Sequence, residues 1–260
     1  MQVAAPIRSG TQVALSPEVD LQSFSGIYCP KSVGTRATGQ DGPSDRETTA
    51  DLSLPLIKAL ARTMAGRDRS THEHAQRVQR YAVALAREVG ISDHPMLEAI
   101  DVAALLHDIG KLGIPDRVLH KPGPLKQDEY DLVKQHVIIG ADILSAVAFP
   151  GPLALLVRHH HENWDGTGYP DRLRGADIPT GARILAIVDC YDALTSDRPY
   201  RRALSHGAAV AMIHERRGTM YDPEMTDAFL RIVQRLRLAP REQAERRRAL
   251  APWRLERRAV

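Results

Sequence analysis

The hydrophobic positions of this chain recur at spacings of three and four residues from about Leu54 to Leu236. This spacing places apolar side chains on one face of a helix, and no sustained alternation typical of a half-buried strand interrupts it. The sequence therefore predicts an all-α helical bundle. Turn-forming stretches rich in Gly and Pro separate the main predicted helices, which cover residues 71–90, 96–112, 126–147, 153–162, 181–194 and 222–236.

The two ends of the chain differ from this pattern. Residues 1–50 are rich in Gly, Ser, Thr, Pro and Gln without sustained periodicity, and we interpret them as a flexible N-terminal arm. Residues 51–238 are expected to form one folded domain. Residues 239–260 form an Arg-rich tail, which we interpret as a solvated extension, with a frayed or partner-docked helix as the alternative.

Several predicted helices carry a polar side chain on an otherwise apolar face. His74, for example, shares its face with Val78, Tyr81 and Leu85. A single histidine in this position is most often a core residue hydrogen-bonded to the backbone. A whole set of separate buried polar groups would be costly unless each had its own partner, whereas one shared partner satisfies them all. The set consists of His74, His107, His136, His160 and Asp189.

The residue types in this set indicate a divalent transition metal. Imidazole and carboxylate ligands without thiolate suit iron, manganese or zinc. Asp108 follows His107 and His161 follows His160, which adds two further potential ligands. The enlarged set exceeds the four ligands of a structural zinc site, whereas two ions bridged by a carboxylate would use it fully. We therefore expect a two-metal centre in the core of the bundle.

The same residues lie in motifs that resemble the HD-GYP family, a branch of the HD-domain metal-dependent phosphohydrolases. The stretches "HEHAQRV" and "TMYDPEMTDAFL" extend the resemblance to about residues 54–235. The motifs between them are "LLHDIGKLGIP" at 105–115, "HVIIGADIL" at 136–144, "HHENWDGTGYP" at 160–170 and "RILAIVDCYDALTSDRPYR" at 183–201.

The resemblance implies an α-helical HD-domain fold and hydrolysis of the bacterial second messenger cyclic di-GMP to pGpG, GMP or both. Another cyclic dinucleotide, 3′,3′-cyclic GMP-AMP, is the alternative substrate. The family's metal centre is typically binuclear and often contains iron, with manganese and zinc as further candidates. A regulatory module without turnover, acting through protein contacts, is the remaining alternative, although the full set of expected ligands is present.

The resemblance also implies roles for individual residues. One metal would take His74, His107, Asp108 and Asp189, with Asp108 bridging to the second metal. The second metal would also take His136, His160 and His161. Two metals would hold the hydroxide that attacks the phosphodiester, and the catalytic candidates are Asp108 and Lys111. The substrate-binding candidates are Arg183, Arg198, Arg201 and Tyr169.

Two of these assignments have alternatives. Arg183 is equally consistent with a structural ion pair. In the "GYP" loop of Gly168, Tyr169 and Pro170, glycine could simply permit a tight turn over which the tyrosine packs. Alternatively, the loop could present an exposed edge that docks the substrate or a diguanylate cyclase (GGDEF) protein.

Composition sets the remaining expectations. The chain has 260 residues with a formal net charge of +3, and its aromatic content of 5% disfavours extended stacking on nucleic acid. Its two cysteines lie in unlike contexts, which indicates reduced thiols and a cytoplasmic protein. No apolar run reaches about 18 residues, so no membrane span is expected. The sequence is also consistent with a homodimer.

Overall fold

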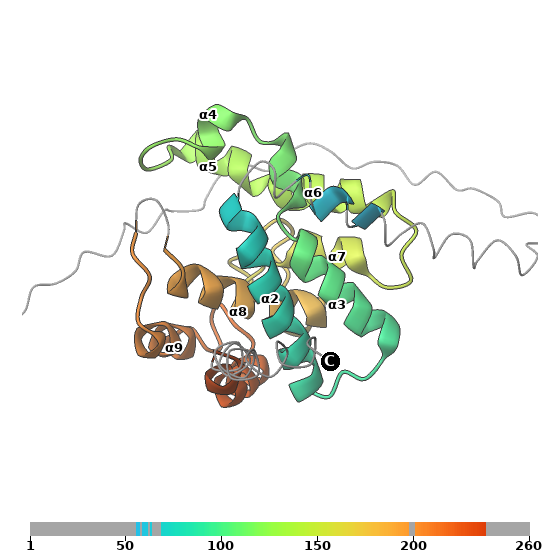
Figure 1. Cartoon of the computed structure of the whole chain (residues 1–260), viewed down its shortest axis with the longest axis vertical. Helices are drawn as coiled ribbons and strands as arrows, with labels where there is room; N and C mark the ends of the chain where they lie inside the picture. Colours follow the sequence, from blue (N-terminus) through green and yellow to red (C-terminus); the bar gives the residue numbers. More distant parts are fainter. Residues whose placement is uncertain (1–55, 58, 62, 64–68, 198–200, 238–260) are drawn as a thin grey trace, which may run out of the picture. The chain divides into compact units, whose positions relative to one another are not determined.

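The computed structural model describes residues 56–57, 59–61, 63, 69–197 and 201–237 (Figure 1). Within these residues the regular elements are helices, apart from an isolated β-bridge between Arg217 and Tyr221. The predicted all-α fold is therefore confirmed. The expected N-terminal arm and Arg-rich tail lie outside the described residues, so the predicted domain boundaries stay a prediction.

The longest helix among the described residues, α2 (Arg69–Glu88), packs against α3 (His94–Leu106) and α8 (Thr180–Thr195) (Figure 1). A second set of contacts joins α6 (His136–Ser145) to α7 (Leu153–His159) and to the 3₁₀ helix η1 (Ile109–Gly113). Because α7 also contacts α3 and α8, the two sets of contacts share one interior. The remaining described elements are α4 (Asp116–Leu119), α5 (Gln127–Lys134), η2 (Gly175–Asp177), α9 (His206–Glu215) and the helix over residues 223–237.

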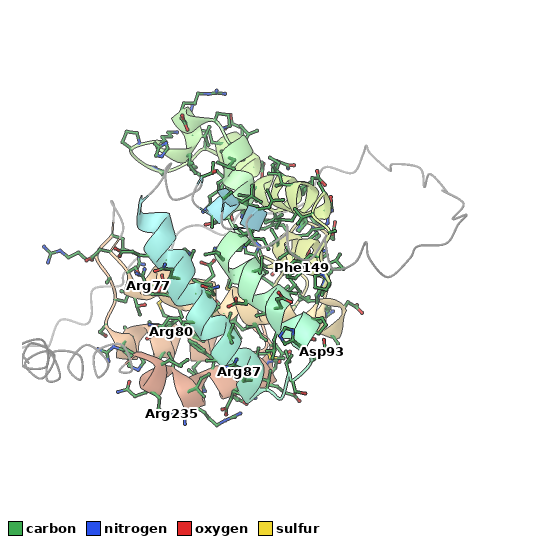
Figure 2. The ribbon with its side chains drawn as sticks, turned by 45° about the vertical axis from the view of Figure 1, so that its right-hand side comes forward. Arg77, Arg80, Arg87, Asp93, Phe149 and Arg235 are labelled. Atoms are coloured by element: carbon green, nitrogen blue, oxygen red, sulfur yellow. The ribbon has the colours of Figure 1, made fainter. Side chains whose placement is uncertain are left out.

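The beginning of α3 is specified locally by its sequence. Asp93, labelled in Figure 2, is the N-cap, and its carboxylate accepts a hydrogen bond from the Met96 backbone N–H at 3.0 Å. Pro95 lies in the first turn, where its missing N–H costs nothing. The cap fixes where α3, the helix that leads to His107, starts.

Figure 2 also shows Arg77, Arg80 and Arg87 following one another along α2.

Two predicted helices are shorter than expected. The helix predicted over 96–112 ends at Leu106, and the chain continues as η1. A Cβ at Gly110 would lie 1.9 Å from the His136 carbonyl oxygen, so η1 packs directly on the backbone at the start of α6. The helix predicted over 126–147 is divided at Gln135 into α5 and α6. Close packing between segments overrides the apolar periodicity at both places.

The core forms where the apolar faces of α2, α3, α7 and α8 meet. Leu85, Ile100, Leu156 and Tyr191 are almost completely buried there, together with Phe229 from the helix over 223–237. The polar residues predicted to share these faces lie at the same interior, and three of them, His107, His136 and His160, lie at helix ends. The bundle therefore brings its unusual polar side chains together.

Candidate metal centre

The structure brings all the predicted metal ligands into one region. They reach it from α2, from the end of α3, from the start of α6, from the end of α7 and from α8. The ligand atoms form two groups, and within each group they lie within 4.8 Å of one another. One group is His74, His107 and Asp189, and the other is His136, His160 and His161.

The first group converges on the Asp189 carboxylate. His74 Nε2 lies 3.2 Å from Asp189 Oδ1 and 3.4 Å from His107 Nε2. His107 Nε2 lies 3.8 Å from the same Asp189 oxygen. Two imidazole nitrogens and a carboxylate oxygen therefore face a common point, which is the donor set expected of a divalent transition metal.

The second group consists of imidazoles alone. The rings of His160 and His161 have centroids 4.1 Å apart, and the His136 ring is 5.4 Å from that of His160. The Nε2 atoms of His136 and His160 are buried without a hydrogen-bond partner among the described residues. Buried polar atoms are normally paired, so these two fit a metal better than they fit an empty protein interior.

Asp108 lies between the two groups. Its Oδ2 is 3.5 Å from His107 Nε2, and its Oδ1 is 3.6 Å from His136 Nε2. The Lys111 ammonium donates a hydrogen bond to Oδ2 at 2.7 Å. Each carboxylate oxygen thus faces one group, which is the arrangement a bridging carboxylate requires.

Three of the histidines are oriented by main-chain carbonyls. Nδ1 of His107, His136 and His160 lies 2.9, 2.7 and 2.7 Å from the carbonyl oxygens of the residues three positions earlier. A carbonyl accepts only, so each Nδ1 carries the proton and each Nε2 keeps its lone pair. That lone pair faces the interior of the site. The carbonyl acceptors belong to Ala104, Val133 and Val157.

Burial and the neighbouring charges shift the pKa values of the ligands in opposite directions. Burial lowers the pKa of His161 to about 4 and that of His160 well below its usual range. Burial opposes the charged form of His74 as well, but hydrogen bonds to Asp189 and Asp192 raise its pKa to about 9. Despite burial, Lys111 and the neighbouring imidazoles keep the pKa of Asp108 low.

These donors suit a metal because they are available at neutral pH. His160 and His161 are neutral there, and Asp108 and Asp189 are ionised. Burial alone would raise the pKa of Asp189, but the hydrogen bond to His74 and the nearby imidazoles lower it more strongly. Without metal, His74 is protonated on both nitrogens at neutral pH, with Nε2–H facing Asp189 and Nδ1–H donated to Asp192. Metal ligation requires deprotonated donors, so an ion bound to the first group would displace the Nε2 proton.

A family model of the HD domain matches residues 58–225. The chain belongs to the HD-domain family. It is 43% identical over 177 residues to "Cyclic di-GMP phosphodiesterase response regulator RpfG" of Xanthomonas campestris, covering 67% of this chain and 47% of the relative. Over 182 residues it is 36% identical to "3'3'-cGAMP-specific phosphodiesterase 2" of Vibrio cholerae, covering 69% of this chain and 35% of the relative. The resemblance predicted from the HD and GYP motifs is thereby confirmed.

A solved structure agrees with this fold. The phosphodiesterase V-cGAP3 of Vibrio cholerae, described as cyclic GMP-AMP specific, superposes with a TM-score of 0.53 at 20% identity. The match covers 73% of this chain and 50% of that chain, and it supports the fold alone. The HD-domain chain spans less than half the length of the two curated relatives, at 47% and 35%.

The GYP loop of the HD domain folds back on the second group of histidines. A Cβ at Gly168 would lie 2.3 Å from the Asn163 backbone nitrogen, so only glycine permits this close approach. Tyr169 follows, joined to Pro170 by a cis peptide bond, and its ring centroid lies 5.1 Å from that of His161. The Tyr169 N–H also donates to the His161 carbonyl at 3.2 Å. The loop therefore forms one wall of the candidate centre.

The predicted substrate-binding arginines occupy different places. Arg183 forms a buried ion pair with Asp222, with Nη1 at 2.6 Å from Oδ2, which is consistent with the structural alternative, and its role in substrate binding stays a prediction. Arg201 is exposed and donates to the Ala193 carbonyl at 2.5 Å and more weakly to that of Leu194, at the end of α8. Arg198 lies outside the described residues.

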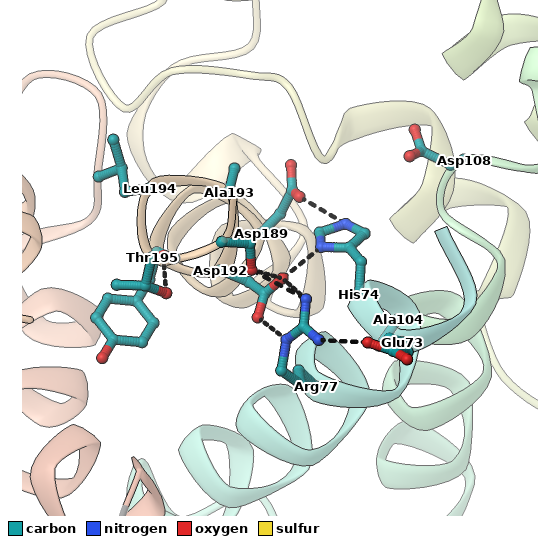
Figure 3. Close-up of polar contacts among 12 residues, drawn as sticks. Glu73, His74, Arg77, Ala104, Asp108, Asp189, Asp192, Ala193, Leu194 and Thr195 are labelled. Carbon is teal, nitrogen blue, oxygen red and sulfur yellow. Dashed lines mark hydrogen bonds and ion pairs between the residues drawn. The ribbon is translucent and has the colours of Figure 1, made fainter. Parts of the chain in front are cut away.

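Sequence reasoning missed a layer of residues behind His74. Asp192 accepts from His74 Nδ1 at 2.7 Å and forms an ion pair with Arg77 (Figure 3). The available signal was the position of Asp192 one turn beyond Asp189 on α8, within "DCYDALT". Its partner Arg77 lies more than a hundred residues earlier in the chain, so the spacing in sequence gave no indication of their contact.

Two further residues lie beside Tyr169. Lys134 has its ammonium 4.7 Å from the centroid of the exposed Tyr130 ring and 5.9 Å from that of Tyr169. Both precede the ligand His136 by a few residues. Cations favour the faces of aromatic rings, so this arrangement adds positive charge next to the GYP loop.

Another acidic and histidine-containing cluster has a different character. Arg158 donates to both carboxylate oxygens of Asp171, at 2.7 and 2.8 Å, and His159 Nε2 lies 2.8 Å from Asp171. Glu162 accepts from the Asp171 N–H at 2.7 Å. The Asp171 carboxylate is therefore already neutralised, and the cluster ties the end of α7 to the segment that follows the GYP loop.

Proposed function

We propose that this chain is a metal-dependent phosphodiesterase that hydrolyses cyclic di-GMP to pGpG, GMP or both. The observation that supports it is the placement of Asp108 between two groups of ligand atoms, with buried Nε2 atoms that have no hydrogen-bond partner. The substrate assignment is supported by the HD-domain relative named a cyclic di-GMP phosphodiesterase.

The proposed centre holds two divalent ions, and we propose iron as the native metal. His74, His107 and Asp189 would hold one ion, His136, His160 and His161 the other, and Asp108 both. Two such ions supply a nucleophile at neutral pH and neutralise the phosphate charge. Nitrogen and carboxylate donors without thiolate suit iron and manganese.

In this proposal Lys111 stabilises negative charge on the phosphate as the bond breaks. Its ammonium is fixed by the hydrogen bond to Asp108 and remains about one-third exposed, at 36%. A preorganised cation of this kind is most effective in a site that excludes water. The Tyr169 ring, packed on His161, would place the sugar or base against the wall of the site. Arg198 and Arg201 are proposed to contact the phosphates of the substrate.

A second candidate substrate is 3′,3′-cyclic GMP-AMP. The observation that favours it is the 36% identity to a relative named a 3'3'-cGAMP-specific phosphodiesterase. Both substrates share the same phosphodiester chemistry at the centre and differ in one base. Competition between the two dinucleotides in a single reaction therefore discriminates them.

The proposed location of this activity is the bacterial cytoplasm. None of the described helices combines the length and the apolar character needed to cross a membrane. Contact of the GYP loop with a GGDEF protein and homodimer formation remain predictions. The half-buried position of Tyr169 and Pro170 supports a role for the loop at the site more than a role as an exposed docking edge.

A product assay tests the proposed activity. The full chain, purified without oxygen and loaded with iron or manganese, is incubated with cyclic di-GMP, and the products are separated by chromatography. We expect pGpG or GMP, at least a 10³-fold lower rate for Asp108→Ala, and an unchanged rate for Asp142→Ala on the exposed side of α6. No turnover with either dinucleotide, despite bound metal, would favour a regulatory module without turnover.

A further inference from the structure

His74 differs from three other ligand histidines in the group that orients it. His107, His136 and His160 each pair Nδ1 with a main-chain carbonyl. His74 Nδ1 instead donates to a side chain, the Asp192 carboxylate, at 2.7 Å. The orientation of His74 therefore depends on a residue that can be substituted.

Asp192 is itself held firmly in place. It is 1% exposed, and its Oδ1 accepts from Arg77 Nε at 2.6 Å. Arg77 Nη2 donates to Oδ2 at 3.0 Å and to Ser196 Oγ, also at 3.0 Å. A bidentate guanidinium fixes both the position and the plane of a carboxylate.

The result is an imidazole fixed between two carboxylates of one helix. Asp189 and Asp192 lie one turn apart on α8, and Figure 3 shows the His74 ring between them. Nδ1 faces Asp192, and Nε2 faces Asp189 at 3.2 Å. With Nδ1–H donated to Asp192, Nε2 points at the first ligand group, and its lone pair would be available to an ion that displaces the Nε2 proton.

We propose that Asp192, held by Arg77, is a positioning residue for one of the two metals and not for the other. A carboxylate that accepts from a ligating histidine fixes its tautomer and orientation and strengthens it as a donor, and its loss typically lowers metal affinity roughly 10- to 100-fold. The effect is confined to the His74 side, because backbone carbonyls orient His136 and His160. This inference rests on the proposed metal centre, but it does not depend on the identity of the nucleotide.

Metal titration without any nucleotide tests the proposal. The full chain is freed of metal by chelation, and Mn²⁺ binding is measured by equilibrium dialysis with elemental analysis. The unmodified chain should bind two ions. Asp192→Asn should retain one ion at the original affinity and bind the other 10- to 100-fold more weakly.

Two further variants, each lacking one ligand, show which of the two ions Asp192→Asn weakens. In Asp189→Ala, which removes a ligand from the His74 side, the remaining ion should be insensitive to Asp192→Asn. In His161→Ala, the remaining ion should be weakened by the same substitution. The matched control is Asp222→Asn, which breaks another buried Asp–Arg pair anchored on α8 and should leave both affinities unchanged.

The outcomes separate this proposal from the proposed activity. Equal weakening of both ions, no weakening, or an equal effect of Asp222→Asn would overturn it. If Asp192→Asn fails to fold by circular dichroism, Arg77→Gln gives the same test with the carboxylate retained, and a smaller but equally one-sided loss is expected. Two intact ions without nucleotide hydrolysis would overturn the activity alone, whereas fewer than two ions in the unmodified chain would overturn both.

Discussion

At the scale of single residues, the candidate centre contains two histidines whose pKa values are shifted in opposite directions. The pKa of His74 is raised to about 9, and that of His161 is lowered to about 4, from an ordinary value of 6.5 in each case. Hydrogen bonds to Asp189 and Asp192 favour the charged form of His74 despite its burial, whereas burial favours the neutral form of His161. The stability of the metal-free protein therefore depends on pH through both residues.

We predict that the stability of the metal-free protein is greatest near pH 6.5. The contribution of His74 is complete below its unfolded pKa of 6.5 and is lost as the pH rises through about 9. The contribution of His161 is present above 6.5 and is lost as the pH falls through about 4. Each amounts to about 3 kcal/mol over its window. Urea unfolding after chelation measures this profile.

A matched pair of variants checks the alkaline side of that profile. His74→Gln should abolish the loss of stability between pH 6.5 and 9, because the titrating group is gone. His94→Gln replaces a histidine whose side chain is 89% exposed and should leave the loss in place. A flat profile for the unmodified metal-free chain over this range would contradict the prediction.

Lys111 gives a residue-scale prediction for catalysis. Replacing it with Met removes the cation beside Asp108 and should lower kcat about 10²-fold, the cost typical of losing one preorganised charge-stabilising group. Steady-state kinetics with cyclic di-GMP measure it, with Arg117→Met on the exposed side of α4 as the control. Equal rates for the two variants would remove Lys111 from the reaction.

The residue scale also shows what the sequence could predict. Polar side chains on apolar faces predicted the candidate ligands His74, His136 and Asp189, because a helical face can be read from spacing alone. The spacing could not distinguish the two interpretations of Arg183, since its partner Asp222 is distant in the sequence. Asp192 was missed for the same reason, because its contacts with His74 and Arg77 arise only from the packing of α2 on α8.

At the scale of elements, the placement of the ligands depends on where helices end. His107 follows the last residue of α3, His136 is the first residue of α6, and His160 follows the last residue of α7. The sequence predicted the existence of these helices well and their ends poorly. Apolar periodicity continues through residues 107–112 and 135, and only the contact of η1 with α6 shows that the helices must stop there.

A substitution at Gly110 tests the contact between η1 and α6. In Gly110→Ala the new Cβ would meet the His136 carbonyl oxygen at 1.9 Å, which forces η1 away from α6. We expect a loss of about 3 kcal/mol in the free energy of unfolding, as for other overpacked sites. Chemical denaturation measures it.

Gly207→Ala is the control for this substitution. A Cβ at this position of α9 would meet nothing within 4 Å, so no clash is introduced. Alanine favours the helix over glycine, and the expected change is neutral or stabilising by up to about 1 kcal/mol. A similar destabilisation by both substitutions would argue against tight packing between η1 and α6.

At the scale of the whole molecule, the candidate ligands join elements that are distant in the chain. One group connects α2 to the end of α3 and to α8, and the other connects the start of α6 to the end of α7. An ion bound to each group would act as a cross-link between these helices. Ligands that bind only the folded state stabilise it in proportion to their occupancy.

Metal removal should therefore lower the thermal stability of the protein. At a free ion concentration one hundred times the Kd, each site contributes about 2.7 kcal/mol. Calorimetry before and after dialysis against chelator should show a lower Tm without metal and recovery on adding Mn²⁺. Asp189→Ala combined with His161→Ala should remove the difference, and an unchanged difference in that variant would place the stabilising ions elsewhere.

The manner in which the histidines are held has an evolutionary consequence. No amino-acid substitution can delete the main-chain carbonyls that orient His107, His136 and His160, so descendants of this chain inherit those orientations as long as the helices persist. The ligand on α2 can be lost by mutation in two ways, by substitution of His74 itself or by substitution of Asp192 or Arg77, which hold its orientation. Adaptive change in metal preference, and the first steps toward a silent homologue, should therefore accumulate on α2 and α8.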